Sequence, residues 1–336
     1  MPLTPSPANM WASLSVPSSA AIDDVPPGVD HTSDSIPFDS SASVAQHIGC
    51  TAIAKPPIHT PKLVDSEEYI GIELELENCN SSSFRTAVNP EWEAVTDGSL
   101  KLNGMEYRFR QPLAGAAIVK ALKKFETALV LLDAAPYHEG HRGSTHFHIN
   151  VSNSSVPELY YQILLSYFVE PVLLAMCKPD RRHNSFAVPS GRTKDTIEVL
   201  DRIRAGQFMF NETAWKYRAV GLNSIYSKGS LEYRMFHSTH DMEEVLGWTN
   251  AVLSIKKASR KFADKIPDMI KRGLAESPQT IIDEIFNGIY DFSPYYDQDD
   301  CPDHLWEFTR MFTYSLRDEM VMSSKVSDYY KKVMGV

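Results

Sequence analysis

Three glutamates in one short segment have the type and spacing of ligands for a metal ion. The segment Ile70–Glu77 reads IGIELELE, so Glu73, Glu75 and Glu77 alternate with smaller apolar residues. Alternation with a period of two is typical of a β-strand and places the carboxylates on one face, with roughly 7 Å between successive ones. Carboxylates held this close repel one another, and a bound cation relieves that repulsion. A solvated strand face is the simpler alternative.

Three further alternating segments carry polar side chains suited to the same site. The segment EYRFR starts at Glu106, and THFHINV holds His146 and His148 on one face. LEYRM does the same for Glu232 and Arg234. Carboxylates combined with imidazole suit Mg²⁺ or Mn²⁺ better than they suit structural zinc. Taken alone, the histidine pair is equally compatible with a packed or a surface pair.

Arginines stand beside these acids. Arg234 follows Glu232 by two residues, so both side chains point the same way. A guanidinium beside a metal-bound carboxylate is the arrangement needed to hold a phosphate during transfer. An ion pair within the strand is the alternative interpretation. Arg108, Arg110 and Arg218 are further candidates for phosphate contacts.

Helical segments separate the predicted strands. Their apolar residues recur at spacings of three and four, which is typical of amphipathic helices. The predicted helices are 116–132, 157–176, 241–262, 278–289 and 303–322. The segments 78–91 and 178–210 are predicted to be loops that set substrate specificity. This order predicts an α+β fold, with a mostly antiparallel sheet backed by helices on one side.

The chain divides into three predicted regions. Residues 1–62 hold ten of the 21 prolines and many serines, and this composition predicts a disordered tail. Residues 63–265 form the predicted catalytic domain, and residues 266–336 form a predicted helical extension packed on it.

Composition and charge exclude some classes of partner. The net charge of −10, from 33 basic and 43 acidic residues, argues against nucleic-acid binding. No apolar run reaches the ~20 residues of a membrane span, which argues against a membrane partner. Four cysteines without a CxxC pair suggest a reducing compartment. We therefore expect a cytoplasmic location, in the host cytoplasm if the source is viral.

Several of these segments, taken in order, resemble one protein family. The motifs are Gly71–Glu75, Thr96–Leu100, Gly104–Glu106, Gly143–Ile149, Lys216–Asn223 and Ser230–Thr239. Their order across about residues 68 to 260 resembles the amidoligases, carboxylate–amine ligases that share the fold of glutamine synthetase and glutamate–cysteine ligase. Many members of that family are encoded by phages. The resemblance implies a glutamine synthetase-like catalytic domain.

The resemblance also implies a metal site. Glu73 and Glu75 would each bind a different divalent cation, Mg²⁺ or Mn²⁺. His148, with His146 beside it, would supply an imidazole ligand, and Glu232 would bind metal together with that histidine. Glu77 is an additional acid that has no counterpart in the family pattern.

Five further residues receive roles from the resemblance. Asp97 and Glu106 would complete the metal cluster or accept the proton of the amine. Arg234 would contact the transferring phosphate, whereas Arg218 and Asn223 would hold nucleotide or the substrate carboxylate. The implied activity is ATP-dependent formation of an amide or peptide bond through an acyl phosphate, from small-molecule or peptide substrates.

Two other interpretations stay open from the residues. One is a phosphotransferase on the same fold, which would phosphorylate a guanidino or carboxyl group. The other is a non-catalytic binding or virion-associated protein. An oligomer is compatible with every one of these interpretations.

Overall fold

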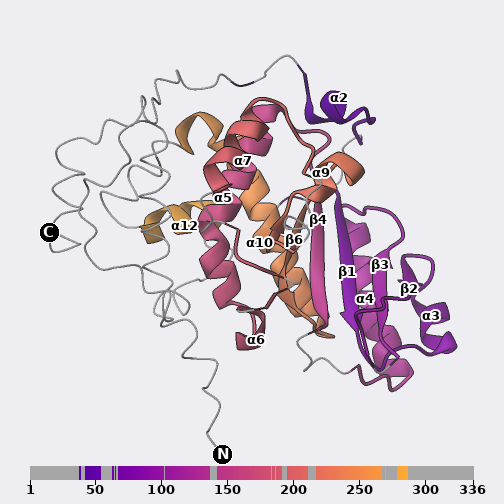
Figure 1. Cartoon of the computed structure of the whole chain (residues 1–336). Coiled ribbons are helices and arrows are strands. Elements are labelled where there is room, and N and C mark those ends of the chain that lie inside the picture. Colours follow the sequence, from indigo (N-terminus) through magenta and orange to yellow (C-terminus); the bar gives the residue numbers. More distant parts are fainter. Residues whose placement is uncertain are drawn as a thin grey trace, which may run out of the picture. The chain divides into compact units, whose positions relative to one another are not determined.

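A six-stranded antiparallel sheet forms the centre of the computed structural model (Figure 1). The structure describes residues 38, 42–53, 63, 65, 67–101, 103–136, 142–182, 184–185, 187–190, 195–210, 217–266, 269 and 278–286. The strand order is β2-β3-β1-β4-β6-β5. The strands are β1 (Ile70–Leu76), β2 (Trp92–Val95), β3 (Met105–Phe109), β4 (Ser144–Asn150), β5 (Val220–Gly221) and β6 (Ser230–His237). Helices and an antiparallel sheet together confirm the predicted α+β class.

Three long helices cover one face of this sheet. They are α4 (Ala116–Leu131), α5 (Val156–Ala175) and α10 (Met242–Lys261), and α10 lies between the other two (Figure 1). The Trp92 indole of β2 donates to the Ala121 carbonyl of α4 at 3.0 Å. On β6, the Tyr233 hydroxyl lies 2.7 Å from that of Ser166 on α5. The apolar side chains of the strands are thereby buried against helices, which leaves the alternate, polar side chains on the opposite face.

Local signals fix where the long helices begin. Ser155 precedes α5, and its hydroxyl and the Glu158 carboxylate bond to each other's backbone N–H groups in a capping box. Asp241 precedes α10 and accepts the backbone N–H groups of Glu243 at 2.9 Å and Glu244 at 3.2 Å. Each cap satisfies donors that the first helical turn leaves without partners. The predicted bounds of these helices therefore agree closely with the observed ones.

The predicted disordered tail is wrong for part of its length. Val44–Ile48 form helix α2, whose N-terminus is capped by a capping box between Ser43 and Gln46. Val44 is fully buried, and its N–H donates to the Ser154 carbonyl at 3.0 Å. The composition of residues 1–62 is rich in serine, so the few apolar residues that anchor this segment were not recognised from the sequence. The remainder of the predicted tail lies outside the described residues, apart from residues 38, 42–43 and 49–53.

Both segments predicted as loops contain helices. The remaining described helical elements are α3 (Ser82–Val88), α6 (Pro179–Arg182), α7 (Asp195–Arg204), α9 (Asn223–Lys228), η2 (Ala263–Lys265) and α12 (Pro278–Phe286). Of these, α3 falls within 78–91, and α6 and α7 fall within 178–210. Strands β2 and β5 were also not predicted, because two to four residues are too few for a clear alternation. The helix predicted at 303–322 lies outside the described residues.

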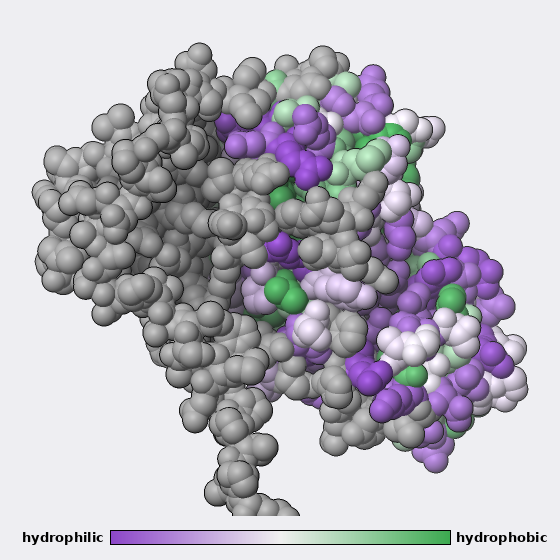
Figure 2. All heavy atoms as spheres, in the orientation of Figure 1, coloured by the Kyte–Doolittle hydropathy of each residue, from purple (hydrophilic) through white to green (hydrophobic). Residues whose placement is uncertain are grey.

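The described surface carries few large apolar side chains. Figure 2 shows hydrophilic residues interspersed with smaller hydrophobic groups on the face in view. Val130 and Leu131, at the end of α4, are 76% and 77% exposed. Among the helices that the structure describes, none is both long and apolar enough to cross a membrane.

Candidate metal centre

Strand register gathers the predicted acids and imidazoles on the face opposite the helices. Glu73 of β1 pairs with His146 of β4, and Glu75 pairs with Glu106 of β3. His148 of β4 pairs with Glu232 of β6. Directly paired residues of an antiparallel sheet point to the same side. Side chains from four strands therefore converge, as the alternation predicted.

The first donor cluster consists of Glu73, His148 and Glu232. One ligand atom from each lies within 4.8 Å of the others. His148 Nε2 is 3.1 Å from Glu73 Oε1 and 3.7 Å from Glu232 Oε1. On the other side of the ring, His148 Nδ1 lies 3.2 Å from the Ser230 hydroxyl. A second partner of this kind orients an imidazole toward a metal, so His148 is presented to the cluster by Nε2.

The second donor cluster consists of Glu75, Asp97 and Glu106, whose ligand atoms also lie within 4.8 Å of one another. Asp97 comes from the loop after β2, where its Oδ1 accepts the Ser99 N–H at 2.7 Å. Burial and the negative charges of Glu73 and Glu75 raise the pKa of Glu106 to about 7. A divalent cation would offset that repulsion, and oxygen donors suit Mg²⁺ or Mn²⁺. The donors present therefore fit the predicted metal.

The surroundings of the first cluster favour the ionised form of both its carboxylates. Burial by itself would raise the pKa of Glu73, but hydrogen bonds and charges from His146 and His148 outweigh burial and lower it. Burial also opposes ionisation of Glu232, and the charges of His148, Arg234 and His146 again lower its pKa. Ionised carboxylates are the form that binds cations.

His146 lies between the two clusters and belongs to neither. Its Nδ1 is 3.2 Å from Glu73 Oε2, and its Nε2 is 2.7 Å from the Ser144 hydroxyl and 3.9 Å from Glu75 Oε1. Both ring nitrogens therefore already have protein partners. The role of His146 as a metal ligand stays a prediction, and its Nδ1 also lies 3.8 Å from Glu232 Oε1 of the first cluster. His146 positions Glu73 and links the clusters.

The same contacts have the connectivity of a serine–histidine–carboxylate triad. Ser144, however, is 3% exposed, and its hydroxyl also donates to Glu75. A hydroxyl has one proton, so it is not also donated to His146 for removal. Ser144 therefore holds Glu75 in place and does not serve as a nucleophile.

Arg234 lies at the edge of the first cluster. Its Nη1 forms an ion pair with Glu232 Oε1, and the Ser224 hydroxyl donates to Glu232 Oε2 at 3.1 Å. Arg234 Nε is buried and has no hydrogen-bond partner within the described part of the chain. The ion pair that was the alternative interpretation of Arg234 is thus present, and its Nε–H remains as a possible donor to an anion such as phosphate.

Two predicted residues do not join either cluster. Arg218 is 7% exposed. Burial of Tyr167 on α5 raises the pKa of its hydroxyl, and the positive charge of Arg218 partly opposes that rise. Arg218 therefore lies near the helices that cover the apolar face. Asn223 begins α9 and has a buried Oδ1 without a hydrogen-bond partner among the described residues. Glu77 accepts the Lys101 N–H at 2.7 Å and braces the loop that carries Asp97.

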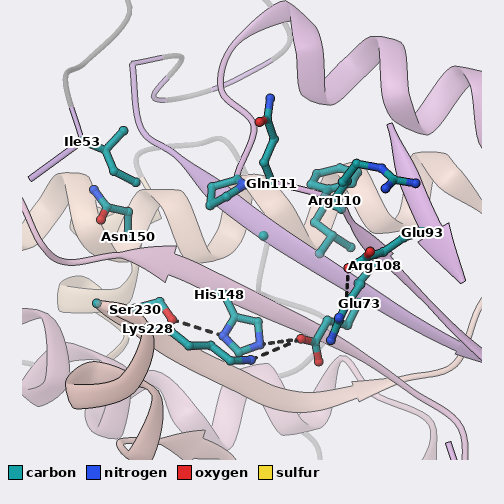
Figure 3. Close-up of a pocket in the computed structure, with 15 residues that line it drawn as sticks. Ile53, Glu73, Glu93, Arg108, Arg110, Gln111, His148, Asn150, Lys228 and Ser230 are labelled. Atoms are coloured by element: carbon teal, nitrogen blue, oxygen red, sulfur yellow. Dashed lines mark hydrogen bonds and ion pairs between the residues drawn. The ribbon is translucent and has the colours of Figure 1, made fainter. Parts of the chain in front are cut away.

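A hollow of about 290 Å³ opens beside the first cluster (Figure 3). Glu73 and His148 form one part of its lining, and Gly71 leaves the sheet surface open between strands. Lys228, the last residue of α9, reaches the same place, with Nζ 3.6 Å from Glu73 Oε1. Lys228, Ser144, Ser224 and Ser230 were not predicted. Ser144 and Ser230 lie within the motifs 143–149 and 230–239, whereas Ser224 and Lys228 only lie near motif residues.

Gly221 supports Glu232 from the neighbouring strand. A Cβ added at Gly221 would lie 3.1 Å from Glu232 Oε2. Gly221→Ala should therefore displace this carboxylate and weaken Mn²⁺ binding, by roughly 10- to 100-fold as for other changes that disturb ligand orientation. Isothermal titration with Mn²⁺ measures the effect. Gly98→Ala is the matched control, because its Cβ meets nothing within 4 Å although Asp97 is adjacent. Equal affinities in the two variants would contradict this account of Gly221.

Comparison with known proteins adds no family assignment. No family model matches the chain, and a search of curated proteins finds no match. The amidoligase resemblance therefore stays a prediction, and the function proposed below is argued from the site.

Proposed function

We propose that the chain is an ATP- and divalent-metal-dependent ligase with a glutamine synthetase-like catalytic domain that joins a carboxylate to an amine. One observation carries the proposal. The clusters Glu73–His148–Glu232 and Glu75–Asp97–Glu106 lie on one sheet face, with His146 between them and Arg234 at the edge. Two adjacent donor clusters beside a guanidinium would suit phosphoryl transfer from ATP, in which metal ions and an arginine neutralise developing charge.

Amide formation in water needs an activated carboxylate. Transfer of the γ-phosphoryl group of ATP to the substrate carboxylate gives an acyl phosphate and ADP, and attack by the amine then gives the amide and free phosphate. Bound Mg²⁺ or Mn²⁺ would neutralise charge on the phosphates. The two donor clusters would hold these ions, because oxygen-rich sites with one imidazole suit them.

The chain's own residues would serve both halves of this reaction. The Arg234 guanidinium, whose buried Nε–H has no hydrogen-bond partner among the described residues, would hold the phosphoryl group in transfer. Asp97 or Glu106 would accept the proton that the amine loses during attack.

The proposal is tested by product analysis. Purified protein is incubated with ATP, Mg²⁺ and pools of amino acids, peptides and polyamines, beside a Glu75→Ala/Glu232→Ala control. Phosphate release is followed together with new masses that are one water lighter than the sum of two inputs. We expect both products from the native chain and neither from the control.

Other outcomes identify the alternatives. An acceptor that gains a phosphoryl group, without condensation, would indicate a phosphotransferase. Binding of Mg²⁺–ATP without any product from broad pools would favour a non-catalytic protein. Failure of the native chain to bind Mg²⁺–ATP at all would overturn the proposed site.

A further inference from the structure

Lys228 is a cation already aimed at the first donor cluster. Its Nζ lies 3.6 Å from Glu73 Oε1, and the close-up shows its side chain running along the hollow toward Glu73 and His148 (Figure 3). The Lys228 side chain is 55% exposed, whereas that of Glu73 is 14% exposed. A flexible, half-exposed lysine is therefore paired with a nearly buried carboxylate that a divalent cation would also bind.

The position of Lys228 makes it a competitor of that cation. Two positive charges that share one carboxylate repel each other, and a divalent ion at the Glu73–His148–Glu232 cluster would have the stronger attraction. An ammonium on a four-carbon stem is free to rotate away, because α9 ends at Lys228 and its side chain is not enclosed. The hollow adjoins the Lys228 side chain, so it is the space into which the ammonium would move.

The hollow has the lining of a site for a small organic anion. Arg108, the other cation near Glu73, is already paired with Glu93 at 2.7 Å and lies 3.7 Å from Glu106. Arg110 also lines the hollow, and its Nε donates to the Pro90 carbonyl at 3.3 Å. Among the described lysines and arginines of the lining, Lys228 is the one that pairs with Glu73. Polar groups of the lining come from Gln111 and Asn150, and apolar contact comes from Ile53 and Pro112.

We propose that Lys228 exchanges between two partners: it competes with the divalent cation for Glu73, and, once displaced, it holds the anionic group of the carboxylate substrate in the hollow. The identity of that anion as a substrate carboxylate rests on the proposed ligase function. The lining selects a short organic acid whose hydrocarbon part contacts Ile53.

The first test uses Mn²⁺ alone and requires no turnover. Removing the competing charge with Lys228→Met should raise Mn²⁺ affinity by roughly 3- to 10-fold, since a half-exposed charge is partly screened. Lys228→Arg retains the charge and should leave the affinity near that of the native chain. Lys123→Met is the control for net charge, because Lys123 is exposed on α4 and pairs with Glu126.

The second test measures coupling between metal and anion. In the native chain, butyrate should tighten Mn²⁺ binding, and Mn²⁺ should tighten butyrate binding by the same factor. Lys228→Met should lose most of this coupling although it binds Mn²⁺ more tightly. A residue that only supports the fold is not expected to give tighter Mn²⁺ binding together with a loss of coupling when it is replaced. Inorganic phosphate, tested in parallel, separates a substrate carboxylate from a nucleotide phosphate as the partner of Lys228.

Each remaining result overturns this inference. Weaker Mn²⁺ binding by Lys228→Met would show that the lysine supports the site instead of competing for it. Unchanged affinity and unchanged coupling would show that it takes no part. If phosphate shows coupling with Mn²⁺ that depends on Lys228 and butyrate does not, Lys228 holds a nucleotide phosphate instead of the substrate carboxylate. Absence of Mn²⁺ binding by the native chain would instead refute the proposed function, so the two failures are distinguishable.

Discussion

Glu232→Gln should abolish ligase turnover, with kcat/KM falling by roughly 10³-fold or more, as for other losses of a group that stabilises transition-state charge. Glutamine has the shape of glutamate without its charge. The substitution replaces one carboxylate oxygen by an amide nitrogen and removes the negative charge that lies 3.7 Å from His148 Nε2 and pairs with Arg234. Mn²⁺ affinity should fall together with turnover. Phosphate release and Mn²⁺ titration measure the two effects.

A matched substitution separates this effect from a general loss of negative charge. Glu126→Gln on α4 also removes one carboxylate, but Glu126 pairs with the exposed Lys123 on a helix that covers the opposite face of the sheet. It should leave Mn²⁺ binding and turnover close to native values. Retention of Mn²⁺ binding and of turnover by a folded Glu232→Gln variant would show that the Glu73–His148–Glu232 cluster is not the metal centre.

Glu68→Leu should lower the free energy of unfolding by about 3–5 kcal/mol, because it removes the carboxylate that balances the buried Lys256 ammonium. Glu68 is 0% exposed and Lys256 of α10 is 1% exposed, with Nζ and Oε2 3.2 Å apart. Arg260 adds a second contact to Glu68 at 3.1 Å, and the Asn150 amide donates to it at 3.4 Å. Urea unfolding, followed by circular dichroism, measures the change.

A double variant tests the cause of that loss. Glu68→Leu combined with Lys256→Met replaces the ion pair by apolar groups of similar size, and it should recover much of the lost stability. Recovery would show that the unpaired charge is what destabilises the single variant. A loss that is simply additive would show instead that packing around residue 68 dominates. Asn150 ends β4, so this buried network also anchors the strand that carries both histidines.

The sequence by itself determined which faces of the strands are polar. Alternation is a property of the local backbone, in which successive side chains point to opposite sides. Glu73, Glu75, His146 and His148 could therefore be assigned to one face of their strands before any pairing was known. The long helices were equally readable, because their spacing and their caps at Ser155 and Asp241 are local.

Tertiary structure decided which of these side chains meet. The order β2-β3-β1-β4-β6-β5 places Glu73 with His148 and Glu232, and it places Glu75 with Asp97 and Glu106. Pairing of strands that are distant in sequence depends on packing and loop closure, which leave no local pattern.

The same reason explains why the partners of two predicted residues could not be read from the sequence. His146 alternates with apolar residues as a ligand would, and in the structure Ser144 and Glu73 contact its two ring nitrogens. Arg218 was a candidate for phosphate contacts, and in the structure its charge acts on Tyr167 of α5. The type and spacing of a residue indicate which chemistry it could perform. Its partners in space, set by the register of four strands, determine which part of that chemistry it performs.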